Sequence, residues 1–413
     1  MISVQRRGVL VAAGVLVVAA AIWLAAIMVA EPLNRTDFRY VWIAGAVWAE
    51  GGNPYSAAFI ARSAAAFGEA DKLSVWVYPF SWYLPSRMLA LLPVETAFRV
   101  WQTLLLGCGA VCAWCAYRAA PVSSAARAPL IALLLLFYCC TNTAVSGLLR
   151  SGQPALVAIT GLAILLYSAR HPSRAATVLG LVLVSFKPQF GLIAFAAVAS
   201  DRAGLLSEVF ATLWIGALSV FVLLSTSFGA QLSALLHSLA GGYQSLVVND
   251  PSHLIALPQF VFALSGARVP LGITTLAATA LVFAICLWTR HFSRRSNDAG
   301  LLCMTVAILA ICFLVGVHGS DLAALILLLP LSLTLAGPAR WLAAAGYLLL
   351  WRPENVSRAA ALPGLIGVST VAVTLICLAF LLAATMWLRK YRYADDEDNV
   401  HPDRSTLVRN VVE

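Results

Sequence analysis

A small set of polar side chains interrupts an otherwise apolar sequence, and their types suit acid–base chemistry beside a bound anion. The set consists of Asp37, Arg39, Arg150, Gln153, Lys187, His318 and Asp321. A carboxylate can take a proton from a reacting hydroxyl, and guanidinium and ammonium groups can hold a phosphate. Such groups are costly beside lipid and usually face a protein interior or a wet cavity. We therefore expect them to share one site, at the level where lipid phosphate headgroups lie.

The composition indicates which kind of fold positions these residues. Of 413 residues, 61% are apolar and only 11% are charged, and the mean hydropathy is +0.88. A soluble domain carries about 25% charged residues, whereas apolar blocks of about 20 residues joined by short basic loops are typical of membrane helices. The predicted fold class is all-α, a polytopic integral membrane protein. The net charge of +9 lies mainly in loops, without a groove-reading motif, so it indicates membrane topology and no nucleic-acid partner.

Hydropathy and the placement of arginine predict twelve membrane helices. The spans are Val9–Ala30, Ala97–Tyr117, Ala128–Leu148, Ala155–Ala169, Ala175–Phe186, Phe190–Ala199, Leu205–Thr226, Leu271–Thr289, Gly300–Val317, Leu322–Ala336, Trp341–Trp351 and Leu362–Leu388. An even number places both termini in the cytoplasm, and the short loops on that side then carry arginine. We expect a single domain over residues 1–388 in the inner (cytoplasmic) membrane, then a disordered acidic tail over residues 389–413.

Two long outer loops are expected, at about 31–96 and 227–258. The first is rich in tryptophan and tyrosine, which suits helices in the headgroup layer. The helix count depends on Ser185-Phe186-Lys187-Pro188, which we interpret as the tip between two short helices, because proline lacks a donor and an unpaired lysine at mid-bilayer is costly. One continuous helix would place Arg290, Arg294 and Arg295 outside, against the charge rule.

Each of these polar residues also has a purely structural interpretation. Asp37 and Arg39 suit an interfacial ion pair, and Lys187 suits a side chain that extends along its helix to reach water. Arg150 and Gln153 suit helix caps. Spacing alone leaves both interpretations open.

His318 and the cysteines have structural interpretations as well. His318 by itself suits a hydrogen-bonded interface residue, and the neighbouring Asp321 favours a functional role. All nine cysteines lie inside apolar runs, where free cysteine usually packs as a small apolar residue. The pattern indicates neither a disulfide framework nor a zinc site.

Short motifs, taken in order, resemble the family 87 glycosyltransferases of the GT-C superfamily, which include polyprenol-phosphate-mannose-dependent α-mannosyltransferases. The motifs are Asp37-Phe38-Arg39-Tyr40, Gly52-Asn53-Pro54-Tyr55, Tyr78-Pro79, Gly152-Gln153-Pro154, Lys187-Pro188 and His318-Gly319-Ser320-Asp321-Leu322. The resemblance extends from about Asp37 to Pro330. It implies a GT-C-type membrane fold with a long first outer loop.

The resemblance also implies an activity: transfer of a hexosyl, in particular mannosyl, group from a polyprenyl monophosphate sugar to a lipid or glycan acceptor on the outer face, with inversion. It implies Asp37 as the general base, Lys187, Arg150 and Arg39 as phosphate ligands, and Gln153, His318, Asp321 and Tyr55 as residues that orient the substrates. Asp37 has no acidic neighbour closer than Glu31, so we expect neither a metal nor another cofactor.

Two other classes of protein stay open. A transporter or flippase for a lipid-linked or anionic substrate would need ionisable groups along a path to both faces, often with matched broken helices in two halves, whereas the polar residues crowd one predicted face. A catalytically silent scaffold gives no reason to keep so many costly polar groups. The sequence leaves open the sugar, the acceptor, the polyprenol and the oligomeric state.

Overall fold

The computed structural model describes residues 36–68, 76–121, 128–237, 254–292, 298–315, 318–359 and 366–400, together with Val18, Ile22 and Leu33. Every secondary-structure element in these ranges is a helix, which confirms the all-α prediction for this part of the chain. The predicted first span, Val9–Ala30, lies outside the described residues except for two of its positions, and so does the chain after Val400.

Four described helices are long and apolar enough to cross a membrane, namely α5 (Val94–Ala119), α11 (Arg202–Leu223), α14 (Leu271–Phe292) and the first part of α20 (Val368–Val400). Shorter apolar helices accompany them, namely α8 (Ala155–Arg170), α9 (Arg174–Ser185), α10 (Pro188–Ala199) and α15 (Ala299–Leu314). Large apolar side chains on α11, such as Leu213, Trp214 and Phe221, are exposed, as lipid-facing residues are. The chain is therefore a helical membrane protein. The total of twelve spans stays a prediction.

The break predicted at Lys187 is present. Helix α9 ends at Ser185, Lys187 has an extended backbone (φ −123°, ψ 98°), and Pro188 is the first residue of α10. Proline is favoured at this position because its missing N–H would have no partner inside the helix anyway.

Two spans predicted as continuous are broken, and the first break is at Asn142. The predicted helix Ala128–Leu148 is in fact α6 (Ala128–Thr141) followed by α7 (Thr143–Ser151). The Asn142 side chain accepts hydrogen bonds from the backbone N–H groups of Ala144 (2.9 Å) and Val145 (3.3 Å). This side chain caps a new helix start, which hydropathy does not register.

The second break replaces the predicted helix Leu322–Ala336. The chain there forms a 3₁₀ turn η5 (Gly319–Leu322) and two single turns, α16 (Ala323–Ile326) and α17 (Leu329–Ser332). The N–H groups of Leu327 and Leu328 bond to carbonyls three residues back, and Pro330 has no N–H to continue a regular helix. At the C-terminal end the structure is more helical than predicted, because α20 continues past Leu388 to Val400.

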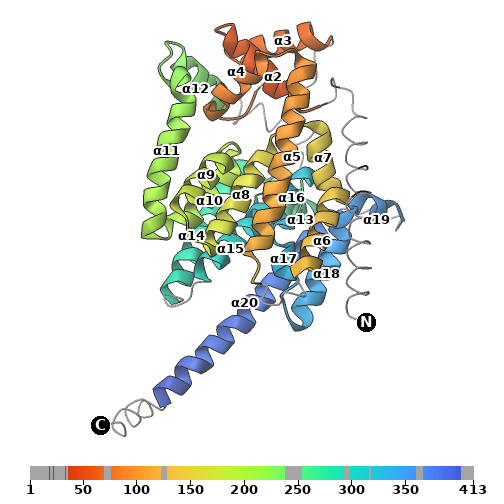
Figure 1. Ribbon diagram of the computed structural model, residues 1–413, viewed down its shortest axis with the longest axis vertical. Helices are drawn as coiled ribbons and strands as arrows, with labels where there is room; N and C mark the ends of the chain where they lie inside the picture. Colours follow the sequence, from red (N-terminus) through yellow and green to blue (C-terminus); the bar gives the residue numbers. More distant parts are fainter. Residues whose placement is uncertain are drawn as a thin grey trace.

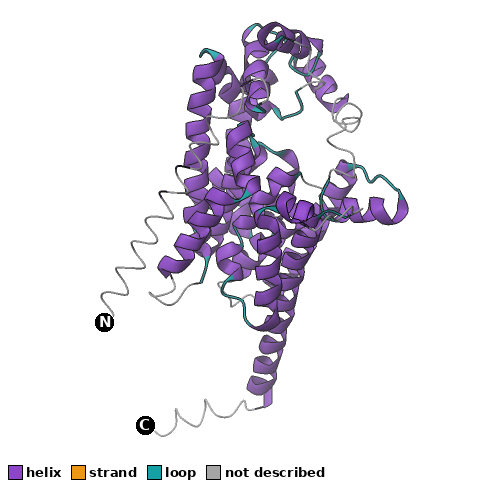
Figure 2. Ribbon diagram, turned by 90° about the vertical axis from the view of Figure 1, so that its right-hand side faces the viewer, coloured by secondary structure: helices purple, strands orange, loops and turns teal. Residues whose placement is uncertain are grey.

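Much of the segment predicted as the first outer loop folds into a unit of short helices that we call the headpiece. It comprises α2 (Phe38–Ala49), α3 (Ala57–Phe67), η2 (Phe80–Trp82) and α4 (Tyr83–Ala90). Helix α2 lies directly on α4, because a Cβ on Gly45 would be 2.0 Å from the carbonyl oxygen of Ser86. Figures 1 and 2 show the headpiece at one end of an elongated helical body.

Aromatic side chains form the core of the headpiece. Trp76 and Trp82 are each 1% exposed and Trp48 is 4% exposed, and the rings of Trp48 and Tyr83 lie 5.3 Å apart, edge to face. These three tryptophans pack inside the headpiece, and the position of the outer loop in the headgroup layer stays a prediction. The indole N–H of Trp48 also donates to Gln231, which ties the headpiece to α12 (Phe228–His237).

Most residues of α8 are buried in the bundle. A Cβ on Gly161 of α8 would lie 2.4 Å from the backbone nitrogen of Val184 in α9, so the two helices approach backbone to backbone. The remaining described helices are α13 (Leu257–Ser265), α18 (Gly337–Trp351) and α19 (Pro353–Ala359). Helix α18 packs extensively along α20.

Turns that carry arginine meet at the end of the bundle away from the headpiece (Figure 1). Arg170 pairs with Asp298, and an Arg290 nitrogen lies 3.5 Å from a carboxylate oxygen of Asp201. His171 contacts the carbonyl oxygen of Arg118 at 3.1 Å. These are turns that the charge rule assigns to the cytoplasm.

Candidate functional site

Three turns of the bundle meet beneath the headpiece. They join α7 to α8, α9 to α10, and α15 to η5, and they carry most of the polar residues singled out in the sequence. Indole groups hold two of them by hydrogen bonds. In the headpiece, the N–H of Trp82 donates to the carbonyl oxygen of Phe186 (3.0 Å). On α5, the N–H of Trp101 donates to the carbonyl oxygen of Gly152 (2.8 Å).

Gly152 sets the shape of the first turn. It ends α7 in the left-handed region (φ +67°), and a Cβ there would lie 2.8 Å from Cβ of Phe38. Left-handed backbone is costly for other residue types, and the close approach excludes a side chain. This turn therefore brings Ser151 and Gln153 beside the residue before Phe38, which is Asp37.

Asp37 lies just before α2, outside the membrane-spanning helices, and is partly buried. The side chains of Ser151 and Gln153 hydrogen-bond to its carboxylate, and the charges of Arg39 and Lys187 act on it. Burial raises the pKa of Asp37 above its ordinary value of 3.8, and the hydrogen bonds and cations offset this only in part. A carboxylate with a raised pKa is a stronger base once ionised.

Lys187 and Asp321 form a buried ion pair. The ammonium of Lys187 donates to Oδ1 of Asp321, and the two residues are 8% and 2% exposed. The backbone N–H of His318 bonds to Oδ2 of Asp321 at 3.3 Å, and the Lys187 nitrogen lies 4.7 Å from the centre of the Phe190 ring. This pairing excludes the interpretation in which Lys187 extends along its helix to reach water.

The other predicted phosphate ligands lie around this centre. The Arg39 guanidinium donates to the Tyr40 hydroxyl (2.7 Å) and lies 4.9 Å from the centre of its ring. Arg150 is on the last turn of α7, beside Ser151, and is exposed. The structure therefore places Asp37, Arg39 and Lys187 within electrostatic reach of one another and Arg150 at the edge of the turn.

The predicted substrate-orienting residues separate into two groups. Gln153, His318 and Asp321 are at the converging turns, and the Oε1 atom of Gln153 is buried without a hydrogen-bond partner among the described residues. Tyr55 is different, because it is 4% exposed in the headpiece core and its hydroxyl donates to the carbonyl oxygen of Tyr78 (2.7 Å). That position gives Tyr55 a packing role in the headpiece, and its role in orienting substrates stays a prediction.

Ser151 bonds to the central carboxylate, a contact that the sequence did not predict. The only signal available was its place directly before Gly152-Gln153. The sequence predicts a headgroup-layer position for Trp82 and a membrane span for Trp101. It gives no sign that their indole groups bond to the turns at Phe186 and Gly152. Contacts across 104 and 51 residues of sequence leave no local pattern.

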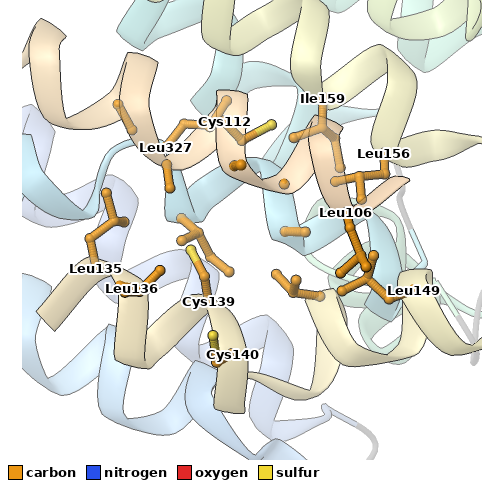
Figure 3. Close-up of a pocket in the computed structure, with 17 residues that line it drawn as sticks. Leu106, Cys112, Leu135, Leu136, Cys139, Cys140, Leu149, Leu156, Ile159 and Leu327 are labelled. Atoms are coloured by element: carbon orange, nitrogen blue, oxygen red, sulfur yellow. The ribbon is translucent and has the colours of Figure 1, made fainter. Parts of the chain in front are cut away.

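An apolar cavity of about 180 Å³ adjoins the same turns. It lies between α5, α6, α7, α8 and α16, and Figure 3 shows leucine, isoleucine and cysteine side chains around it. Its lining includes Leu149, which precedes Arg150, Leu156, which follows Pro154-Ala155, and Ala323, which follows Asp321-Leu322. The polar site and the cavity are therefore built on shared turns.

The site's ligand chemistry favours an anion over a cation. Among the described residues, no three His, Cys, Asp or Glu side chains gather as metal ligands do. Asp321 is already paired with Lys187, and Asp37 accepts hydrogen bonds from Ser151 and Gln153. The expectation of a metal-independent site stays a prediction. Comparison of the chain with protein-family models, with curated proteins and with solved structures gives no significant match.

Proposed function

We propose that this protein is a membrane glycosyltransferase of the GT-C type, similar to family 87. It transfers a hexosyl group, in particular mannosyl, from a polyprenyl monophosphate sugar to a hydroxyl of a lipid or glycan acceptor, with inversion, on the outer face of the cytoplasmic membrane. One observation carries the proposal: the partly buried carboxylate of Asp37 lies near the charges of Arg39 and Lys187 and accepts hydrogen bonds from Ser151 and Gln153. These two residues belong to a turn whose neighbours, Leu149 and Leu156, line an apolar cavity.

Asp37 is the general base of this reaction. It takes the proton of the acceptor hydroxyl while that oxygen attacks the anomeric carbon, and the bond from that carbon to the phosphate oxygen breaks on the opposite side. Such proton transfer contributes about 10² to 10⁴ in rate. The hydrogen bonds from Ser151 and Gln153 fix the direction of the carboxylate, which supports the alignment that the attack requires.

Cations near Asp37 hold the phosphate that leaves. Among the described charged residues at the candidate site, Arg39, Arg150 and Lys187 are positive and Asp37 and Asp321 are negative, so the formal charge is +1. That charge matches the single negative charge of a phosphodiester. Asp321 keeps the ammonium of Lys187 in place, and the charge that develops on the leaving phosphate is stabilised by cations already positioned.

The apolar cavity suits the isoprenoid chain of the donor. Its lining is made of aliphatic side chains, small residues and three thiols, Cys112, Cys139 and Cys140. A prenyl chain gains about 0.8 kcal/mol for each buried methylene. The shared turns would then place the phosphate at the polar end while the chain stays among helices.

The experiment is transfer of a radiolabelled sugar. Purified protein in lipid nanodiscs is incubated with polyprenyl phosphate mannose, glucose or arabinose and with an extract of membrane lipids and glycans, and the labelled product is identified. Asp37→Asn should still bind the donor but lose transfer, and Asp201→Asn, a carboxylate paired with Arg290 at the opposite end, should remain active.

The same preparation distinguishes the flippase alternative. Movement of an intact lipid-linked sugar across a vesicle membrane without a new glycosidic bond would support a flippase and contradict the transferase. Full transfer activity in Asp37→Asn would remove Asp37 from the mechanism.

A further inference from the structure

Two cysteines face each other at the end of the bundle away from the candidate site. Cys286 is on α14 and Cys303 is on α15, and the two residues are 0% and 1% exposed. The thiol of Cys286 lies 3.9 Å from the carbonyl oxygen of Cys303, and the thiol of Cys303 lies 3.9 Å from the carbonyl oxygen of Cys286. The sulfur of each cysteine therefore lies beside the backbone of the other cysteine, and the two side chains are adjacent.

A cation accompanies this pair. Arg290 follows Cys286 by about one helical turn, its Nε donates to Oγ of Ser200 (2.7 Å), and its guanidinium contacts Asp201. The side chains of Arg290 and Ser200 also lie against the Cys303 thiol. A neighbouring guanidinium is a feature of reactive cysteines in proteins.

The cysteines around the apolar cavity have different surroundings. Cys112 has Thr160 beside it, with a sulfur to oxygen distance of 3.4 Å, and Cys139 and Cys140 line the cavity among leucines (Figure 3). The pair of Cys286 and Cys303 thus combines two features, mutual contact and a neighbouring guanidinium.

We propose that Cys286 and Cys303 are a redox-active dithiol that closes to a disulfide between α14 and α15. Two S–H bonds break and one S–S bond forms, and the pair gives up two electrons and two protons. Because the thiols are buried among apolar helices, the acceptor is a lipid-soluble quinone, which takes up both electrons and both protons and becomes a quinol. This inference does not depend on the proposed glycosyl transfer.

The link would fix the first turns of α15 to α14. The chain continues from α15 to the turn that holds His318 and Asp321, so the disulfide would restrain one of the three turns of the candidate site from a distance. The disulfide would also cross-link the unfolded chain across the short segment between the two cysteines, which lowers the conformational entropy of the unfolded state. The oxidised protein should therefore resist heat better than the reduced protein.

The test is oxidation of the purified full chain in lipid nanodiscs with decylubiquinone, and in parallel with diamide. Mass spectrometry of unreduced peptides should show Cys286 linked to Cys303, with loss of two hydrogens and reversal by dithiothreitol. The count of free thiols in the denatured protein should fall by two from nine. Cys303→Ser should abolish the link, whereas Cys312→Ser, a matched buried cysteine farther along α15, should leave it intact.

Dibromobimane bridges two thiols that are in contact, so it tests contact between Cys286 and Cys303 separately from their oxidation. Bridging without any disulfide under either oxidant would show that the thiols touch but are not redox-active, and absence of bridging would show that they do not touch. Either result overturns the proposal. A link between other cysteines in place of this one would also overturn it.

The role of Arg290 has its own measurement. Arg290→Gln should slow disulfide formation about tenfold, and Arg290→Lys, which keeps the charge, should slow it by about twofold or less. Arg202→Gln, an exposed arginine at the start of α11, is the control and should have no effect. Gel filtration confirms that each variant is folded. An equal rate in Arg290→Gln would contradict activation by this guanidinium.

Discussion

Lys187 and Asp321 are separated by 134 residues of sequence and form one buried ion pair. The pair joins the turn between α9 and α10 to the turn after α15, and both turns border the carboxylate of Asp37 or the residues that contact it. Each partner is a charge that would be costly in the membrane if it were alone. Together they allow two broken helices to meet at the site.

Removal of one partner should therefore be strongly destabilising. Asp321→Asn leaves the Lys187 ammonium buried without its carboxylate, and loss of one member of a buried pair costs about 3 to 5 kcal/mol. Thermal unfolding in nanodiscs measures the effect. Asp298→Asn breaks the largely exposed pair with Arg170 and should cost less than about 1 kcal/mol.

The exchange of the two charges separates stability from function. Lys187→Asp combined with Asp321→Lys should recover part of the lost stability, because the pair is restored in reverse. It should not recover sugar transfer if the phosphate requires the ammonium at its native position. Full activity of the exchanged protein would show that the pair is structural only.

The rate of transfer should depend on pH through Asp37. Burial raises the pKa of this carboxyl above 3.8, and only the ionised form accepts a proton, so activity should increase with pH through a range above 3.8. The free energy of unfolding should change in the opposite direction. Because the folded state binds the Asp37 proton more tightly than the unfolded state, this contribution to stability is complete below pH 3.8 and is lost as the pH rises through the raised pKa. Rate profiles and unfolding measured from pH 4 upward check both directions, and Asp37→Asn should remove this contribution to stability.

Gly152→Ala should damage both the fold and the site. A residue with a Cβ pays about 1 to 2 kcal/mol for left-handed backbone, and this Cβ would lie 2.8 Å from Cβ of Phe38. Either Phe38 or the turn must move, so Asp37 loses its alignment with Ser151 and Gln153. Gly147→Ala, also on α7 but with open space around its Cβ position, should be neutral or slightly stabilising. Wild-type turnover by Gly152→Ala would show that this alignment is not needed.

A larger side chain in the apolar cavity should weaken binding of donors that carry a long prenyl chain. Ala113 lines the cavity, so Ala113→Phe should raise KM about tenfold for a long-chain polyprenyl phosphate sugar, a loss equal to about two buried methylenes. A donor with a single short prenyl unit should be unaffected. Val111→Phe, on the exposed side of α5, is the control. Equal effects on both donors would place the prenyl chain elsewhere.

Three features of this protein follow from local properties of the sequence. Hydropathy is a property of each segment, so apolar content alone predicts the helical membrane fold, and Pro188 alone predicts the end of a helix beside Lys187. The cost of charge in lipid likewise marks Asp37, Lys187 and Asp321 as residues that need partners.

The partners themselves were decided only by the tertiary structure. The turn at Gly152 brings Ser151 to Asp37, and helices distant in sequence bring Asp321 to Lys187, because a buried charge or donor is satisfied by whichever group the packed helices place beside it. The contacts of Tyr55 also escaped prediction: its side chain packs in the headpiece core, and its hydroxyl donates to the carbonyl oxygen of Tyr78. The breaks at Asn142 and before Pro330 also escaped prediction, because caps and turns depend on single hydrogen bonds that an average over an apolar segment does not register.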